Sequence, residues 1–292
     1  MGRLSGPVCV ELGQLSIGHL RDIIKLSKRA LRDCSEHRLL LAVSRATADF
    51  HREQGLTGCE IRVFYNGVDL ELFRPREPTG WLHRELGLPP HALLIGTVGQ
   101  LILRKGQDKL AEAAAGMAAA DFKWFRPLPE LHYVFVGERA SEKPETILYE
   151  QRLHETFAQA GISDRAHFLG RRENLHLLLP ELAMLVHPAR QEPLGRVLLE
   201  AAAVGLPIIA TGVGGTREIL APDGIHPGST GGMIVEPDNH LVLMDFIPIH
   251  IFDVHRRRTL SSSARELMED RFDIRVRARK LVELYTELLE RG

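Results

Sequence analysis

Two glutamates eight residues apart, Glu192 and Glu200, are the side chains of this chain best placed to do chemistry. Glu192 precedes a Pro-Leu-Gly turn, and Glu200 is the one charged or strongly polar side chain between Val197 and Ala210. A buried ionised carboxylate costs several kcal/mol or takes up a proton unless hydrogen-bond donors surround it. Ribose hydroxyls are such donors. We therefore expect Glu200 to lie in the first turn of a helix, where the helix dipole favours negative charge, and to bind a ribose.

The turn between the two glutamates is a candidate anion site. Gly195 lets the backbone approach a ligand closely, and a helix that opens near Arg196 directs unpaired N–H groups at the same place. The backbone groups concerned are those of Leu194, Gly195, Arg196 and Val197. This arrangement predicts a site for a nucleotide-diphosphate sugar. The alternative is that Glu200 only complements the helix N-terminus and that Glu192 is a solvated loop residue.

Short apolar runs alternate with helical patterns, which is typical of an α/β fold with a parallel sheet covered by helices on both faces. We predict strands at 92–98, 132–136, 166–169, 183–187, 207–210 and 232–235. We predict helices at 107–120, 146–160, 174–181, 196–204 and 216–220. Ligands of such sheets bind beyond the carboxyl ends of the strands. The loops after residues 98, 187 and 210 are therefore expected to share one crevice.

The residues around the two glutamates resemble the retaining glycosyltransferases of family 4, which have the GT-B fold with Rossmann-like domains. The resemblance rests on Glu192-x7-Glu200, Gly205-x-Pro207, the strand IIAT and the segment GGTRE at 214–218. GTVGQLILRKGQDKLAEA (96–113) is similar to the family's first donor-domain strand, phosphate loop and helix. VFYNGVDLELFRP (63–75) is similar to its interdomain connection, and the likeness spans about residues 19–239. It implies transfer of a hexose to a hydroxyl acceptor with retention, without a cofactor and without an obligatory metal.

The resemblance also implies roles for single residues. Glu192 would orient the sugar hydroxyls and support an oxocarbenium-like transition state, while Glu200 would hold the ribose. His19, in SIGHLRD, is a second catalytic candidate that would face the sugar across the cleft; the alternative is a surface or structural histidine. The loop 170–174, which contains Arg171, is expected to contact the base of the donor.

The leaving diphosphate would be held by the loop that follows Gly99. Lys105 occupies the family's lysine position, but the arginine position holds Gln100, so Arg104 is expected to substitute for it. Charge-assisted bonds to phosphate are worth about 1.5–3 kcal/mol each and strengthen as the diphosphate gains charge. The alternative is that Arg104 and Lys105 are an ordinary solvated pair.

Upstream of the donor domain the elements are fewer. We predict a helix at 20–38, a strand at 39–43, a helix at 45–54 and a strand at 61–65. Residues 1–75 are therefore interpreted as a partial acceptor-side domain with the interdomain connection, since a usual domain has about 100–150 residues. Residues 76–292 are interpreted as the complete donor domain with closing helices. A fragment, a misjudged start site and a second chain that supplies the missing domain remain open.

The charge and cysteine content of the chain limit the kinds of partner that we expect. A net charge of −1 gives no indication of nucleic acid, and Cys9, Cys34 and Cys59 form no CxxC pair, which favours reduced thiols in the cytoplasm. We expect a saccharide or lipid-linked acceptor. Residues 256–258 are a run of three arginines that is by default a solvated face; the alternative is peripheral contact with the anionic inner membrane face.

Other chemistries do not fit the sequence. The segment GVGGTRE lacks the third glycine of GxGxxG, and no GxxxxGK[ST], GxSxG or HExxH is present, so no dehydrogenase, P-loop or zinc-protease site and no metal site is predicted. Another GT-B enzyme, such as a phosphorylase or a nucleotide-sugar epimerase, and a non-catalytic donor-binding module remain alternatives.

The C-terminal segment departs from the family pattern in part. Residues 240–255 are rich in β-branched and aromatic side chains and have Pro248 in the middle, which argues against a helix. From about 262 to 290 a helical pattern resumes, and part of its apolar face is expected to be exposed.

Overall fold

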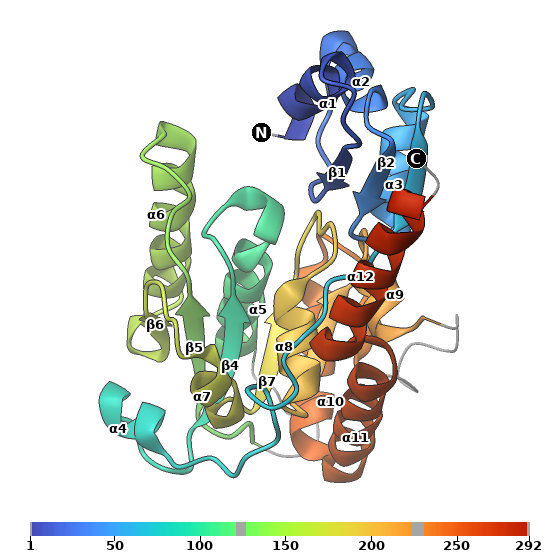
Figure 1. Cartoon of the computed structure of the whole chain (residues 1–292). Helices are drawn as coiled ribbons and strands as arrows, with labels where there is room; N and C mark the ends of the chain where they lie inside the picture. Colours follow the sequence, from blue (N-terminus) through green and yellow to red (C-terminus); the bar gives the residue numbers. More distant parts are fainter. Residues whose placement is uncertain (1, 121–126, 223–230, 291–292) are drawn as a thin grey trace.

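The computed structural model describes residues 2–120, 127–222 and 231–290, which contain two parallel sheets with helices packed on both faces (Figure 1). The small sheet has the order β1-β2-β3. Its strands are β1 (Ile17–Leu20), β2 (Leu39–Ala42) and β3 (Glu60–Val63). The large sheet has the order β6-β5-β4-β7-β8-β9. Its strands are β4 (Leu93–Val98), β5 (Leu131–Val136), β6 (Ala166–Phe168), β7 (Met184–His187), β8 (Ile208–Thr211) and β9 (Met233–Val235).

The large sheet reverses its direction of growth between β4 and β7. The chain moves outward from β4 through β5 to β6 and then returns to pair β7 with the other edge of β4. In parallel sheets of this kind the loops on the two sides of the reversal diverge and leave a crevice for a ligand. All six predicted strands are confirmed to within one residue at each end.

Helices cover the two faces of the large sheet in two sets. One face carries α5 (Gln107–Ala119), α6 (Pro144–Gln159) and α10 (His240–Phe252). The other carries α7 (Leu175–Leu178), α8 (Arg196–Ala203), α9 (Thr216–Leu220) and α11 (Val254–Arg271). Neighbouring side chains of β4 serve opposite faces, since Leu94 packs with the α8 side and Ile95 with the α5 side. Burial of each such side chain stabilises the fold by about 1.5–3 kcal/mol.

The small sheet is covered by its own helices and by the C-terminal helix. One face of the small sheet carries α2 (Lys28–Ser35) and α3 (Arg45–Glu53), and α12 (Ile274–Glu290) runs along the opposite face (Figure 1). Leu39 and Leu41 of β2 pack against Leu288 of α12. Val282 and Leu289 remain 63% and 73% exposed, which confirms the expected exposure of the closing helices.

Two predictions of secondary structure are wrong, at 20–38 and 240–255, and a third, at 174–181, is confirmed in part. The expected helix at 20–38 begins only at α2, where Ser27 accepts a hydrogen bond from the Ala30 amide, because the preceding chain forms β1 and an extended segment. The expected helix at 174–181 divides into α7 and the 3₁₀ turn Leu179–Glu181. The segment 240–255 does form a helix, α10, although Pro248 lies inside it. Asn239 caps its first turn, and burial of Leu243 and Ile247 against the α5 side compensates for the proline.

Several short elements were not predicted. These are the helices α1 (Gly2–Glu11) and α4 (Trp81–Leu86) and the 3₁₀ turns Leu103–Lys105 and Ser163–Arg165. The three cysteines are free thiols. Over the described ranges, no helix combines the length and the apolar content that crossing a membrane requires.

Candidate functional site

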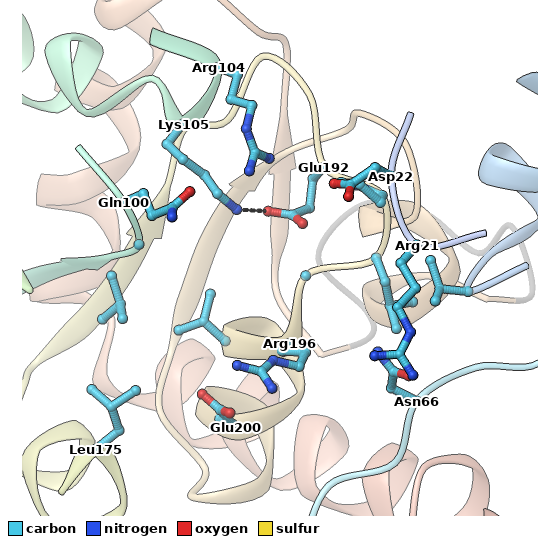
Figure 2. Close-up of a pocket in the computed structure, with 17 residues that line it drawn as sticks. Arg21, Asp22, Asn66, Gln100, Arg104, Lys105, Leu175, Glu192, Arg196 and Glu200 are labelled. Carbon is cyan, nitrogen blue, oxygen red and sulfur yellow. Dashed lines mark hydrogen bonds and ion pairs between the residues drawn. The ribbon is translucent and has the colours of Figure 1, made fainter. Parts of the chain in front are cut away.

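A cavity of about 450 Å³ lies where the large sheet reverses, between β4 and β7, and faces the small sheet. The large sheet contributes the loop after β4, the loop after β7 and the first turns of α8. Residues 2–75 around the small sheet are called the small unit, and the part of the chain around the large sheet the large unit. The small unit contributes Arg21, Asp22 and Asn66 to the opposite wall (Figure 2), and Val43 also lines the cavity. The volume lies in the range of small-molecule sites.

Most of the predicted site residues line this cavity. They are Gly99, Arg104, Lys105, Glu192, Leu194, Gly195, Arg196, Val197 and Glu200. Two lie outside its lining. His19 is an exposed residue of β1, and the Arg171 side chain is 72% exposed and lies 3.6 Å from Glu173, although Leu175 just beyond that loop does line the cavity. The catalytic role of His19 and the base contact of Arg171 stay predictions.

Glu192 is a buried carboxylate held by two nitrogen donors. Its Oε2 lies 2.5 Å from Lys105 Nζ and 2.8 Å from His187 Nε2. Burial alone raises the pKa of Glu192, but the hydrogen bonds and charges of His187 and Lys105 outweigh it and lower that pKa to about 2. Glu192 is therefore an anion at neutral pH, and His187 must carry its hydrogen on Nε2 because a carboxylate can only accept. His187 ends β7, which fixes it rigidly beneath the carboxylate.

The backbone of Glu192 is positioned by the glycines that follow β8. The Gly215 amide donates to the Glu192 carbonyl oxygen at 2.9 Å. Gly214 has φ of 52°, and a Cβ added there would overlap the same carbonyl oxygen. The segment GGTRE therefore needs glycine at these positions to approach the loop that carries Glu192.

The loop that carries Arg104 and Lys105 is fixed to the loop that carries Glu192. Arg190 donates to both carboxylate oxygens of Asp108, at 2.7 and 2.6 Å, and to the Leu103 carbonyl oxygen at 2.8 Å. The Arg190 amide also donates to the Arg104 carbonyl oxygen at 2.9 Å. Bidentate arginine–carboxylate pairs are strong and geometrically specific. Lys105 is thus placed beside Glu192 by contacts outside the cavity.

Unpaired donors gather at the opening of α8. Gly195 precedes the helix with φ of 97°, and within the described residues the amides of Arg196 and Val197 make no hydrogen bond. Over the same ranges the Arg104 guanidinium makes no hydrogen bond or ion pair, and it points toward Lys105 and Glu192 (Figure 2). A helix N-terminus beside two cations is a site for a diphosphate-like anion.

Glu200 lies in the second turn of α8, because the helix begins at Arg196. The prediction of a first-turn position is therefore wrong, and the helix dipole gives this carboxylate little help. In the part of the chain that the structure describes, its oxygens accept no hydrogen bond. Burial raises the pKa of Glu200 to about 7, and the nearby Arg196 charge opposes that rise (Figure 2). Within the described residues, Glu200 therefore still lacks the hydrogen-bond donors that a buried carboxylate needs.

Reasoning from the sequence missed several residues of the site. His187 could have been found, because it is the last residue of a strand five positions before Glu192. Asn66, in the segment 63–75 that resembles the interdomain connection, also lines the cavity. The contact between Arg190 and Asp108 could not be predicted, because no local sequence pattern links the two residues. Among the described residues, no group of three or more His, Cys, Asp and Glu side chains is arranged to hold a metal ion.

Relatives of this chain are glycosyltransferases. It is 24% identical over 278 residues to the lipopolysaccharide core biosynthesis mannosyltransferase LpsB of Rhizobium meliloti, covering 92% of this chain and 75% of that protein. It is 29% identical over 260 residues to the D-inositol 3-phosphate glycosyltransferase of Xylanimonas cellulosilytica, covering 86% of this chain and 57% of that protein. The chain thus spans little more than half the length of the second relative.

Solved structures share the fold. The structure of Anabaena Alr3699/HepE in complex with UDP and glucose matches with a TM-score of 0.83 and 24% identity, over 97% of this chain and 74% of that chain. The expected GT-B type of α/β architecture is confirmed by this match and by the two parallel sheets. The family described as glycosyl transferases group 1 matches residues 82–265, which include β4 to β9 and most of the cavity. This chain therefore belongs to the glycosyl transferases group 1 family.

Proposed function

We propose that this chain transfers a hexose from a nucleotide-diphosphate sugar to a hydroxyl group of a saccharide or lipid-linked acceptor, with retention at the anomeric carbon, as in family 4. One observation carries the proposal: a single cavity joins an ionised Glu192 to Lys105 and to the open N-terminus of α8. The presence of UDP in the matching Anabaena structure supports a nucleotide-linked donor. No cofactor and no obligatory metal enter the proposed reaction.

The diphosphate of the donor binds the cations and amides at the opening of α8. The Arg196 and Val197 amides face it, and Lys105 and Arg104 neutralise its charge. An ammonium has three hydrogens, so Lys105 can keep its bond to Glu192 while it binds a phosphate oxygen. As the sugar–phosphate bond breaks, negative charge grows on the diphosphate, and these fixed donors stabilise the transition state more than the ground state.

Glu192 acts on the sugar side of the same bond. Its low pKa keeps it an acceptor for sugar hydroxyls and a negative charge beside the developing oxocarbenium ion. The bond from the anomeric carbon to the phosphate oxygen breaks, and a bond from the acceptor oxygen forms. The acceptor hydroxyl passes its proton to the departing phosphate oxygen, and the nucleoside diphosphate leaves with that proton. Glu200 accepts the ribose hydroxyls, and the wall formed by Arg21, Asp22 and Asn66 faces the acceptor.

A donor-binding module without transfer is the second candidate. The observation that favours it is the small sheet, which has three strands over the described residues, so that β1 and β3 are both edge strands. The residues proposed to contact the donor lie around the large sheet, so donor binding would persist even if the small sheet bound the acceptor poorly. Both candidates therefore predict that the nucleotide donor binds, and only the transferase predicts turnover.

Calorimetric titration with UDP, GDP and ADP, with a donor-hydrolysis assay on the same samples, separates these candidates. The transferase predicts that one nucleotide binds, that its hexose donor is hydrolysed, and that Glu192→Gln removes hydrolysis and keeps binding within a few-fold. Binding without hydrolysis by the wild type would favour the module. Absence of binding by all three nucleotides would refute both.

A further inference from the structure

The segment GGTRE ends in a glutamate that contacts the other sheet. Glu218 lies in α9 of the large unit, and its carboxylate meets the first turn of α3 in the small unit. It accepts hydrogen bonds from the Arg45 amide at 2.8 Å and the Ala46 amide at 2.9 Å. The Tyr65 hydroxyl donates to it at 2.8 Å. A carboxylate from one unit thus caps a helix of the other, where unpaired amides and the helix dipole both favour it.

The same end of α3 also contacts the catalytic loop. Ser44 Oγ lies 2.5 Å from the Pro193 carbonyl oxygen, and Thr47 Oγ1 lies 3.3 Å from it. Ser44 Oγ also accepts from the Thr47 amide and so caps the helix from within. These hydroxyls are buried. The position of α3 therefore fixes the Pro193–Leu194 peptide, one residue beyond Glu192.

The two peptide groups that follow Glu192 are held from opposite sides. The Gly215 amide binds the Glu192 carbonyl from the large unit, and Ser44 and Thr47 bind the Pro193 carbonyl from the small unit. Glu218 joins these two sides, since it follows Gly215 by three residues and caps the helix that Ser44 begins. None of its three hydrogen-bond donors lines the cavity.

We infer that Glu218 is a positioning residue of the proposed transfer reaction: it fixes the small unit over the catalytic loop, so that the acceptor wall stands opposite Glu192. This inference rests on the proposed function for its catalytic consequence. The donor contacts at Lys105, Glu200 and the opening of α8 belong to the large unit and do not need Glu218. Loss of Glu218 therefore uncouples transfer from donor binding.

Glu218→Gln tests this with little change of shape. The amide keeps the volume but places an NH₂ group against backbone donors, which cannot pair with it. Glu236→Gln is the matched control, because Glu236 is exposed and lies 3.9 Å from Arg217. Tyr65→Phe removes one of the three bonds and should give a smaller effect in the same direction. Hydrogen exchange of residues 45–48, donor titration and transfer rates are measured on all four proteins.

For Glu218→Gln we expect protection at residues 45–48 to fall about tenfold or more, because the substitution removes the charge-assisted character of the bonds to the Arg45 and Ala46 amides. Donor affinity should stay within about twofold, while the transfer or hydrolysis rate falls about tenfold or more. A purely structural role would lower donor affinity together with the rate. Unchanged exchange, or an unchanged rate, would overturn the inference. Failure of the wild type to bind nucleotide would refute the proposed function instead, and the exchange measurement would still test the contact.

Discussion

Replacing Glu200 with glutamine should make the protein more stable and a weaker nucleotide binder. Burial raises the pKa of this carboxyl from 4.5 to about 7, so the folded protein resists its ionisation. At about 1.4 kcal/mol for each pKa unit, this rise lowers the free energy of unfolding by about 3 kcal/mol when Glu200 is charged. Glutamine has the same shape and no charge, and it removes that cost.

The pH dependence of this effect has a definite sign. Folded Glu200 holds its proton more tightly than unfolded Glu200, so unfolding releases a proton between pH 4.5 and about 7. Its contribution to stability therefore falls as pH rises through that window and is constant above it. The stability advantage of Glu200→Gln should be small near pH 5 and reach about 3 kcal/mol near pH 8.

Urea unfolding at several pH values measures this difference. Wild type and Glu200→Gln are compared with Glu283→Gln, which changes an exposed glutamate of α12. A difference between wild type and Glu200→Gln that does not change with pH would refute the reasoning. Binding should move the other way: Glu200→Gln should weaken nucleotide affinity about tenfold near pH 8, because ribose hydroxyls lose a charged acceptor. Equal affinities of the two proteins near pH 8 would contradict a ribose contact.

Three other substitutions test the loops around Glu192. Lys105→Met should weaken diphosphate binding by about 10–100-fold in calorimetry, through loss of a charge-assisted bond, whereas Lys109→Met should not; equal losses would refute the phosphate contact. Arg190→Lys should raise the donor KM several-fold because lysine cannot bind both oxygens of Asp108; an unchanged KM would show that this pair does not position the loop. Gly106→Ala should destabilise the fold by about 1–3 kcal/mol in urea unfolding, because φ is 68° and a Cβ would overlap a carbonyl oxygen; wild-type stability would contradict this.

Much of the large sheet could be predicted from local sequence patterns. Its strands are short, nearly continuous apolar runs, because both faces are buried, and each is bounded by loop residues. Sequence spacing also singled out three residues that line the cavity, namely Lys105, Glu192 and Glu200. These signals are local, so one sequence was sufficient to read them.

The errors arose where tertiary contacts decide. The helix α10 is predominantly apolar, and its burial against the α5 side overrides Pro248. The strand β1 has four residues and takes its conformation from pairing with β2. The Arg190–Asp108 pair joins residues 82 positions apart and has no sequence pattern. Residues so far apart in the sequence come together only in the folded protein, so local patterns do not reveal their contacts.

A crystal structure with the tightest-binding nucleoside diphosphate tests the central claim most directly. The proposed function predicts phosphate oxygens within hydrogen-bond distance of the Arg196 and Val197 amides and of Lys105 Nζ, with the ribose hydroxyls on Glu200. A nucleotide bound elsewhere, or one in the cavity whose phosphates lie away from the opening of α8, would contradict it.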